Sequence, residues 1–139
     1  MSYMSTIKRA VILFAITYSS LAYAEWKVYA EIEGEMTFYY DPTTVKESGK
    51  YVKVWAMRNY KAAQKTARGD YFLSQKLQWL FLCKDEVSTI TSMVMYSEID
   101  GMGSVVFSGT RREQDYQFEP VAPGTVSEEL YRLACKNRR

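Results

Sequence analysis

Residues 71–83 read YFLSQKLQWLFLC, and residues 51–60 before them read YVKVWAMRNY. In residues 51–60, Val52, Val54 and Ala56 alternate with Tyr51, Trp55 and Met57, which is the period of a β-strand. Residues 71–83 place apolar residues on one face in the same way, namely Leu73, Leu77, Trp79, Phe81 and Cys83. No helical pattern separates the two stretches, so we expect two antiparallel strands that are apolar on both faces.

Four further strands are predicted around this pair, over residues 26–33, 36–40, 87–96 and 104–108. Gly34 indicates a tight reversal between the first two, and one long strand with a bulge is the alternative. Asp41-Pro42 closes the second strand, because proline cannot donate to a central ladder.

The C-terminal segment has a helical pattern. Thr125-Val126-Ser127-Glu128 fits a capping box, with the Thr125 hydroxyl as cap and Glu128 reaching back. An apolar stripe at helical spacing follows, made of Val126, Leu130, Leu133 and Ala134, with Cys135 off its centre. We therefore predict the α+β class: a single antiparallel sheet of about six strands, with a C-terminal helix packed on one face and one disulfide.

The N-terminal segment is typical of a secretory signal. Lys8 and Arg9 precede an apolar run over residues 10–17, and Ala22-Tyr23-Ala24 follows as a small-x-small exit. We expect residues 1–24 to be removed and residues 25–139 to form one domain. An uncleaved anchor is the alternative, although the run is short of the ~18–20 residues needed to span a bilayer. No cysteine near the exit offers a lipid attachment site, so any membrane association is expected to be peripheral.

Composition excludes several classes of protein. The formal charge of +2 comes from the two basic residues of the signal, so residues 25–139 carry 16 basic and 16 acidic residues. A formally neutral domain argues against a general nucleic-acid binder. The absence of histidine removes the commonest general base and metal ligand, and no phosphate-binding or nucleophile-elbow motif is present. We expect no enzyme, no metal and no cofactor.

Export also bears on the two cysteines, Cys83 and Cys135. An oxidising compartment favours a disulfide between them, and two buried free thiols are the alternative.

A series of short features runs along the chain in order. It consists of Trp26, Tyr40-Asp41-Pro42, Val54-Trp55, Tyr60-Lys61, Ser74, Lys76, Cys83, Tyr96-Ser97, Gly101, Val121, Pro123-Gly124-Thr125, Leu130 and Cys135. The series covers nearly all of residues 25–139 and resembles the bacterial surface-adhesin protein E-like family. The resemblance implies a small antiparallel sheet whose C-terminal helix is tethered by the disulfide. It also implies a dimeric outer-membrane adhesin that binds host vitronectin, laminin or plasminogen.

The densest basic stretch is the candidate protein-binding site. It comprises Arg58, Tyr60, Lys61, Lys65 and Arg68, and no acidic residue lies between Arg58 and Asp70. We expect it on an exposed loop between the third and fourth strands, where it would attract acidic segments of a partner. A solvated loop without a binding role is the alternative.

The second sheet face is a candidate for self-association. One helix covers one face, so the apolar residues on the other face, such as Tyr51 and Trp55, predict a homodimer contact. Glu31, Glu33 and Glu35 are assigned to edge protection rather than to catalysis.

Together these features predict an exported, non-enzymatic bacterial protein of the periplasm or outer-membrane surface, similar to surface adhesins. The alternative is a soluble periplasmic structural or assembly factor that binds another protein of the bacterial envelope.

Overall fold

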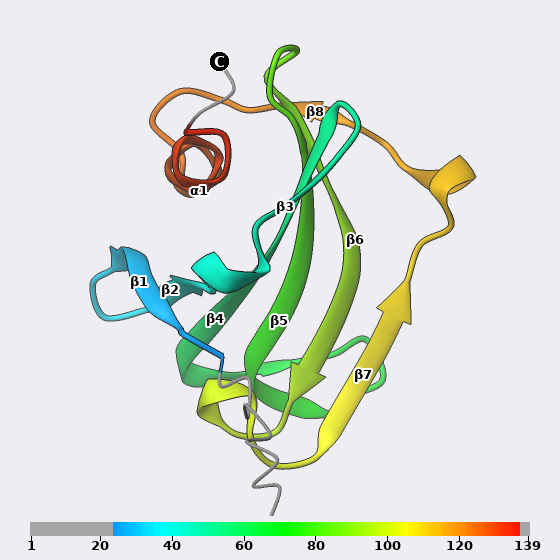
Figure 1. Ribbon diagram of the computed structural model, residues 1–139. Coiled ribbons are helices and arrows are strands. Elements are labelled where there is room, and N and C mark those ends of the chain that lie inside the picture. Colours follow the sequence, from blue (N-terminus) through cyan, green and yellow to red (C-terminus); the bar gives the residue numbers. More distant parts are fainter. Residues whose placement is uncertain (1–23, 137–139) are drawn as a thin grey trace, which may run out of the picture.

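The computed structural model describes residues 24–136, and a single antiparallel sheet forms most of it (Figure 1). The sheet order is β1-β2-β4-β5-β6-β7, with β3 paired to β4 and β8 paired to β6. The strands are β1 (Lys27–Ile32), β2 (Met36–Tyr40), β3 (Lys46–Ser48), β4 (Tyr51–Lys65), β5 (Tyr71–Leu82), β6 (Val87–Tyr96), β7 (Val105–Thr110) and β8 (Glu119–Pro120). The helix is α1 (Val126–Ala134), and three short 3-10 turns cover Pro42–Thr44, Ile99–Gly101 and Glu113–Asp115.

The predicted fold class is confirmed, but the sheet has eight strands rather than about six. The two additional strands, β3 and β8, have three and two residues, too few to produce a periodic pattern. Asp41-Pro42 ends β2 as predicted. The Asp41 carboxylate then accepts a hydrogen bond from the Thr43 N–H at 2.9 Å in the turn after β2. The strand that follows this turn, β3, pairs with β4. The predicted signal peptide lies, except for Ala24, outside the described residues.

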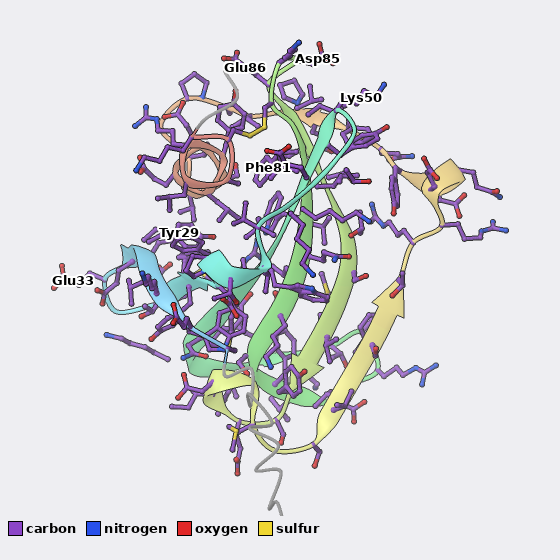
Figure 2. The ribbon with its side chains drawn as sticks, viewed as in Figure 1. Tyr29, Glu33, Lys50, Phe81, Asp85 and Glu86 are labelled. Atoms are coloured by element: carbon purple, nitrogen blue, oxygen red, sulfur yellow. A yellow bond between two sulfur atoms is a disulfide. The ribbon has the colours of Figure 1, made fainter. Side chains whose placement is uncertain are left out.

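The core lies between α1 and one face of β4 and β5. Figure 2 shows Phe81 of β5 beside the helix, and its side chain is fully buried. The buried cluster comprises Val52, Val54, Ala56, Phe81, Cys83, Leu130, Tyr131, Ala134 and Cys135. Complete burial of one such large apolar side chain contributes about 1.5–3 kcal/mol, so the cluster holds the helix on the sheet.

The helical stripe differs from the prediction at one residue. Leu133 is 37% exposed, whereas Tyr131 is 6% exposed and Cys135 is fully buried. Two bonds turn α1 this way: the Cys83–Cys135 disulfide, with Cα atoms 5.7 Å apart, and a hydrogen bond of 2.7 Å from the Tyr131 hydroxyl to the Cys83 carbonyl. The disulfide is thus confirmed, and Cys135 reaches Cys83 from the C-cap position at the end of the helix.

The helix begins as the capping pattern predicts. The Thr125 hydroxyl accepts from the Glu128 N–H at 3.3 Å. The Glu128 carboxylate accepts from the Gly124 N–H at 3.4 Å, one residue before the cap. The first contact pairs a donor that the first helical turn leaves without an intrahelical partner, and the second fixes the residue before the cap.

No described helix covers the sheet face opposite α1, but other chain segments cover part of it. At one end Phe118 stacks on Tyr51, with ring centroids 6.1 Å apart. At the other end the Lys76 ammonium lies 5.6 Å from the Trp26 ring and 5.3 Å from the Tyr96 ring, beside the fully buried Met57. Chain segments therefore cover both ends of this face, and a homodimer contact through it stays a prediction, testable by size exclusion with light scattering.

Candidate protein-binding cleft

The predicted basic residues lie mostly on a strand. Arg58, Tyr60, Lys61 and Lys65 belong to β4, and Arg68 follows it in the turn to β5. The expectation of an exposed loop is therefore wrong for four of the five. The sequence after Tyr60 has no apolar alternation. The strand continues because Gln64 and Lys65 pair with Phe72 and Tyr71.

The β4–β5 hairpin bends where this pairing is irregular. The register shifts between Asn59 and Gln64, so residues 60–63 stand outside the regular ladder. Beyond this point the hairpin tip turns and passes behind β6 and β7 in the view of Figure 1. Such irregularities bend the strand that carries the extra residues. The bend brings the basic end of β4 toward an edge of the sheet that is distant in the sequence.

A cleft of about 780 Å³ separates the hairpin tip from β6 and β7. We name it the tip cleft. It is lined by Lys65, Thr66, Ala67, Arg68, Asp70, Phe72, Met93, Met95, Val106, Phe107 and Ser108. Met95 lies directly opposite Phe107 in the β6–β7 pair, so their side chains share one face of the sheet. The tip cleft thus has thioether and aromatic walls, with the exposed cations Lys65 and Arg68 and the carboxylate Asp70 at the tip.

Tyr60 and Lys61 lie near the tip cleft without lining it. The Tyr60 ring contacts Phe72 edge-on at 5.7 Å, so it supports the wall that Phe72 forms. Lys61 is exposed, and its backbone N–H donates to the Glu35 carbonyl at 2.9 Å. The bend therefore also ties the hairpin to the β1–β2 turn.

Arg58 faces a different groove, of about 320 Å³, between the β1–β2 hairpin and the start of α1. Its guanidinium carbon lies 5.7 Å from the Phe38 ring centroid. Tyr29 lines the same groove, and burial raises the pKa of its hydroxyl to about 12 even though the positive charge of Arg58 acts to lower it. Of the five predicted residues, Lys65 and Arg68 thus line the tip cleft, Arg58 lines this smaller groove, and Tyr60 and Lys61 line neither.

An outer strand is the feature that the sequence reasoning missed. β7 is the last strand of the sheet and reads VVFSGT, without a charge or a proline. Val105 and Phe107 are 58% and 49% exposed. The opposite outer strand, β1, carries Lys27 and Glu31. The lack of charge over residues 105–110 was visible in the sequence, but only the sheet order reveals that this strand lies at an edge.

Within residues 24–136, no three His, Cys, Asp or Glu side chains are grouped so that they could hold a metal ion. Glu31, Glu33 and Glu35 are exposed at the β1–β2 edge. In the same part of the chain, no helix has the length and apolar character required to cross a bilayer.

Comparison with known proteins identifies the family. The family described as surface-adhesin protein E matches residues 26–136. The chain belongs to this family. The resemblance found in the sequence is thereby confirmed, and membership supports the role of a surface adhesin.

Solved structures of Haemophilus influenzae protein E have the same fold. One crystal form is 17% identical over 72% of this chain and 80% of that chain, with a TM-score of 0.56. Protein E from a non-typeable strain is 16% identical over 79% of this chain and 76% of that chain, with a TM-score of 0.55. A comparison with curated protein sequences found no match. At these identities the likeness establishes the architecture and not a ligand.

Proposed function

We propose that this protein is an exported, non-enzymatic adhesin that binds host proteins through the β4–β5 hairpin tip. The observation that carries the proposal is the tip cleft, in which Lys65 and Arg68 adjoin walls formed by Met93, Met95 and Phe107. Membership of a surface-adhesin family supports the same role.

The lining of the tip cleft suits recognition of a protein. Methionine and aromatic side chains are enriched at protein interfaces, and methionine adapts its shape to different partners. The exposed ammonium and guanidinium groups would attract acidic segments and raise the rate of encounter. Tyr60 and Lys61 extend this surface along β4, and Arg58 contributes a second contact beside Phe38.

The candidate partners are the matrix and plasma proteins vitronectin, laminin and plasminogen, which the family resemblance implies. The test is binding of the purified protein to each immobilised partner. We expect saturable binding to at least one, and the Lys65→Glu/Arg68→Glu variant should weaken it about tenfold or more, a change of ~1.4 kcal/mol. The Lys50→Glu/Lys84→Glu variant is the matched control, because it reverses the same number of charges in turns outside both grooves.

Absence of saturable binding to all three partners would overturn the adhesin proposal. Equal loss of binding in both charge variants would instead overturn the role of the tip cleft, because it would indicate a response to net charge alone.

We further propose that the chain is cleaved after Ala24 and displayed on the outer-membrane surface. Mass spectrometry of the exported protein should give an N-terminus at Glu25. Protease added to intact cells should degrade a displayed protein. Survival in intact cells, with degradation after outer-membrane permeabilisation, would place the protein in the periplasm and favour a structural or assembly role there.

A further inference from the structure

The outer edge of β7 carries backbone groups that no other strand uses. The Arg111 N–H donates to the Thr91 carbonyl at 2.8 Å, and the next pairs along the ladder are Ser92 with Thr110 and Met93 with Gly109. Bonded and non-bonded pairs alternate in an antiparallel ladder, so Gly109 bonds to β6 while the N–H groups of Ser108 and Thr110 face outward. Since β7 ends the sheet, these donors are available to another strand.

This edge carries few of the devices that discourage strand pairing. Sheet edges are usually blocked by charges, prolines or bulges that point the strand away. β1 carries Lys27 and Glu31 on its six residues, together with a bulge between Val28 and Ala30. β7 has neither a charge nor a proline, and its register shift lies at its start, between Val105 and Phe107. From Phe107 to Thr110 its register with β6 is continuous.

Two grooves adjoin the same strand and would receive the side chains of an added one. The tip cleft contacts Val106–Ser108, and a second groove of about 380 Å³ runs past Gly109 and Thr110 to Arg111. Met93 and Phe107 line both, so the two grooves share apolar walls. Residues of an added strand opposite Phe107 and Gly109 would point to this face of the sheet.

Charge selects the kind of strand. The side chains of Lys65, Arg68 and Arg111 are exposed along the two grooves, against the single carboxylate of Asp70. We propose that β7 binds an extended segment of a partner protein as an additional strand, with apolar and acidic side chains alternating on its groove-facing side. A second copy of this chain fits less well, because its β7 would bring no acidic residue to these cations. The proposal deepens the adhesin proposal and rests on it for the existence of a protein partner.

The test uses a fluorescein-labelled peptide of about ten residues, the length of a typical strand pairing. Threonine occupies every second position of the peptide, and valine and glutamate alternate at the positions between. One face of the strand therefore presents both required side-chain types. Fluorescence anisotropy with the purified protein should show saturable binding. A peptide with lysine in place of glutamate should bind at least about tenfold more weakly. The original peptide N-methylated at alternate residues should also lose binding, because it cannot donate along one edge.

The matched protein variants are Ser108→Pro and Ser108→Ala. The first removes an outward donor on an edge strand, where proline is tolerated, and should weaken peptide binding about tenfold or more. The second keeps the donor and should bind within about twofold of the unmodified protein. Circular dichroism checks that both variants fold. If Ser108→Pro does not fold, the N-methylated peptide tests the same bond on the unmodified protein.

The outcomes separate this proposal from the adhesin proposal. Strand addition is overturned if the unmodified protein does not bind the peptide, or binds the N-methylated peptide equally well. A dimer in light scattering that Ser108→Pro abolishes, without peptide binding, would overturn it in favour of a second copy. If Ser108→Pro leaves host-protein binding intact, the adhesin proposal stands and strand addition at β7 is refuted. If the protein binds the peptide but no host protein, strand addition stands and the adhesin proposal is refuted.

Discussion

The disulfide between Cys83 and Cys135 should supply a large part of the stability of this domain. It joins residues separated by 52 positions in the sequence. In the loop-entropy treatment, closing a loop of this size destabilises the unfolded chain by about 4 kcal/mol at 25 °C. A domain of this size has a total free energy of unfolding of about 5–15 kcal/mol, so the bridge supplies a large fraction of it. We therefore expect Cys83→Ala/Cys135→Ala to lower the free energy of unfolding by about 4 kcal/mol.

Equilibrium urea denaturation of the oxidised protein and the double variant measures this difference. Leu130→Ala is the control, because it keeps the bridge but empties a fully buried site on the same helix, at a cost of about 2–5 kcal/mol. A loss below about 1 kcal/mol in the double variant would refute the entropic reasoning.

Hydrogen exchange distinguishes the entropic mechanism from simple release of the helix. α1 has nine residues, fewer than the ~12–15 that an isolated helix needs in water. If the bridge acts on the whole unfolded chain, the most protected amides of β5 should lose protection along with those of α1. If only α1 loses protection while β5 keeps its original rates, the bridge acts as a local tether and the calculated value does not apply.

Two further predictions concern single hydroxyl groups. Tyr131→Phe removes the 2.7 Å bond to the Cys83 carbonyl and should cost about 1–3 kcal/mol in urea denaturation, because it leaves a buried acceptor with one partner fewer; an unchanged midpoint would contradict this. Tyr29→Phe should abolish a pH dependence. Burial raises the pKa of Tyr29 to about 12, so the folded state holds this proton more tightly than the unfolded state does. Its contribution is fully present below about pH 10 and is lost as the pH rises through about 12, a difference of roughly 2–3 kcal/mol. Tyr71→Phe, at an exposed position, is the control, and an unchanged slope between pH 10 and 12 in Tyr29→Phe would refute the assignment.

The sheet and its helix could be predicted because the residues that form them carry local signals. The alternation over residues 71–83 became β5, and Gly34 marks the reversal between β1 and β2. At β1 a regular alternation would place Val28 on the same face as Ala30 and Ile32. Val28 is 58% exposed, and Tyr29 packs on Tyr40 instead, because the bulge after Val28 changes which side chains point inward. A bulge of this kind leaves no mark in a pattern of apolar and polar residues.

The candidate site could be predicted only in part, because it depends on a bend. Lys65 and Arg68 were identified by charge alone, but their partners in the tip cleft are Met93 and Phe107, which follow them by many residues. The bend arises from a register irregularity between β4 and β5, which is a property of two strands together. No single stretch of sequence contains that information, so the sequence predicts the cations and not the groove.

The position of β7 links the fold to the proposed function. An uncharged, half-exposed outer strand favours aggregation unless another strand pairs with it. The other short strands of this sheet, β3 and β8, both pair with longer neighbours on one side and are charged or contain proline. β7 alone among the described outer strands has neither protection. The bent hairpin adds cations beside it, which repel basic segments and admit acidic ones. The same irregularity that bends β4 thus makes an otherwise indiscriminate edge selective, which is what a binding protein requires.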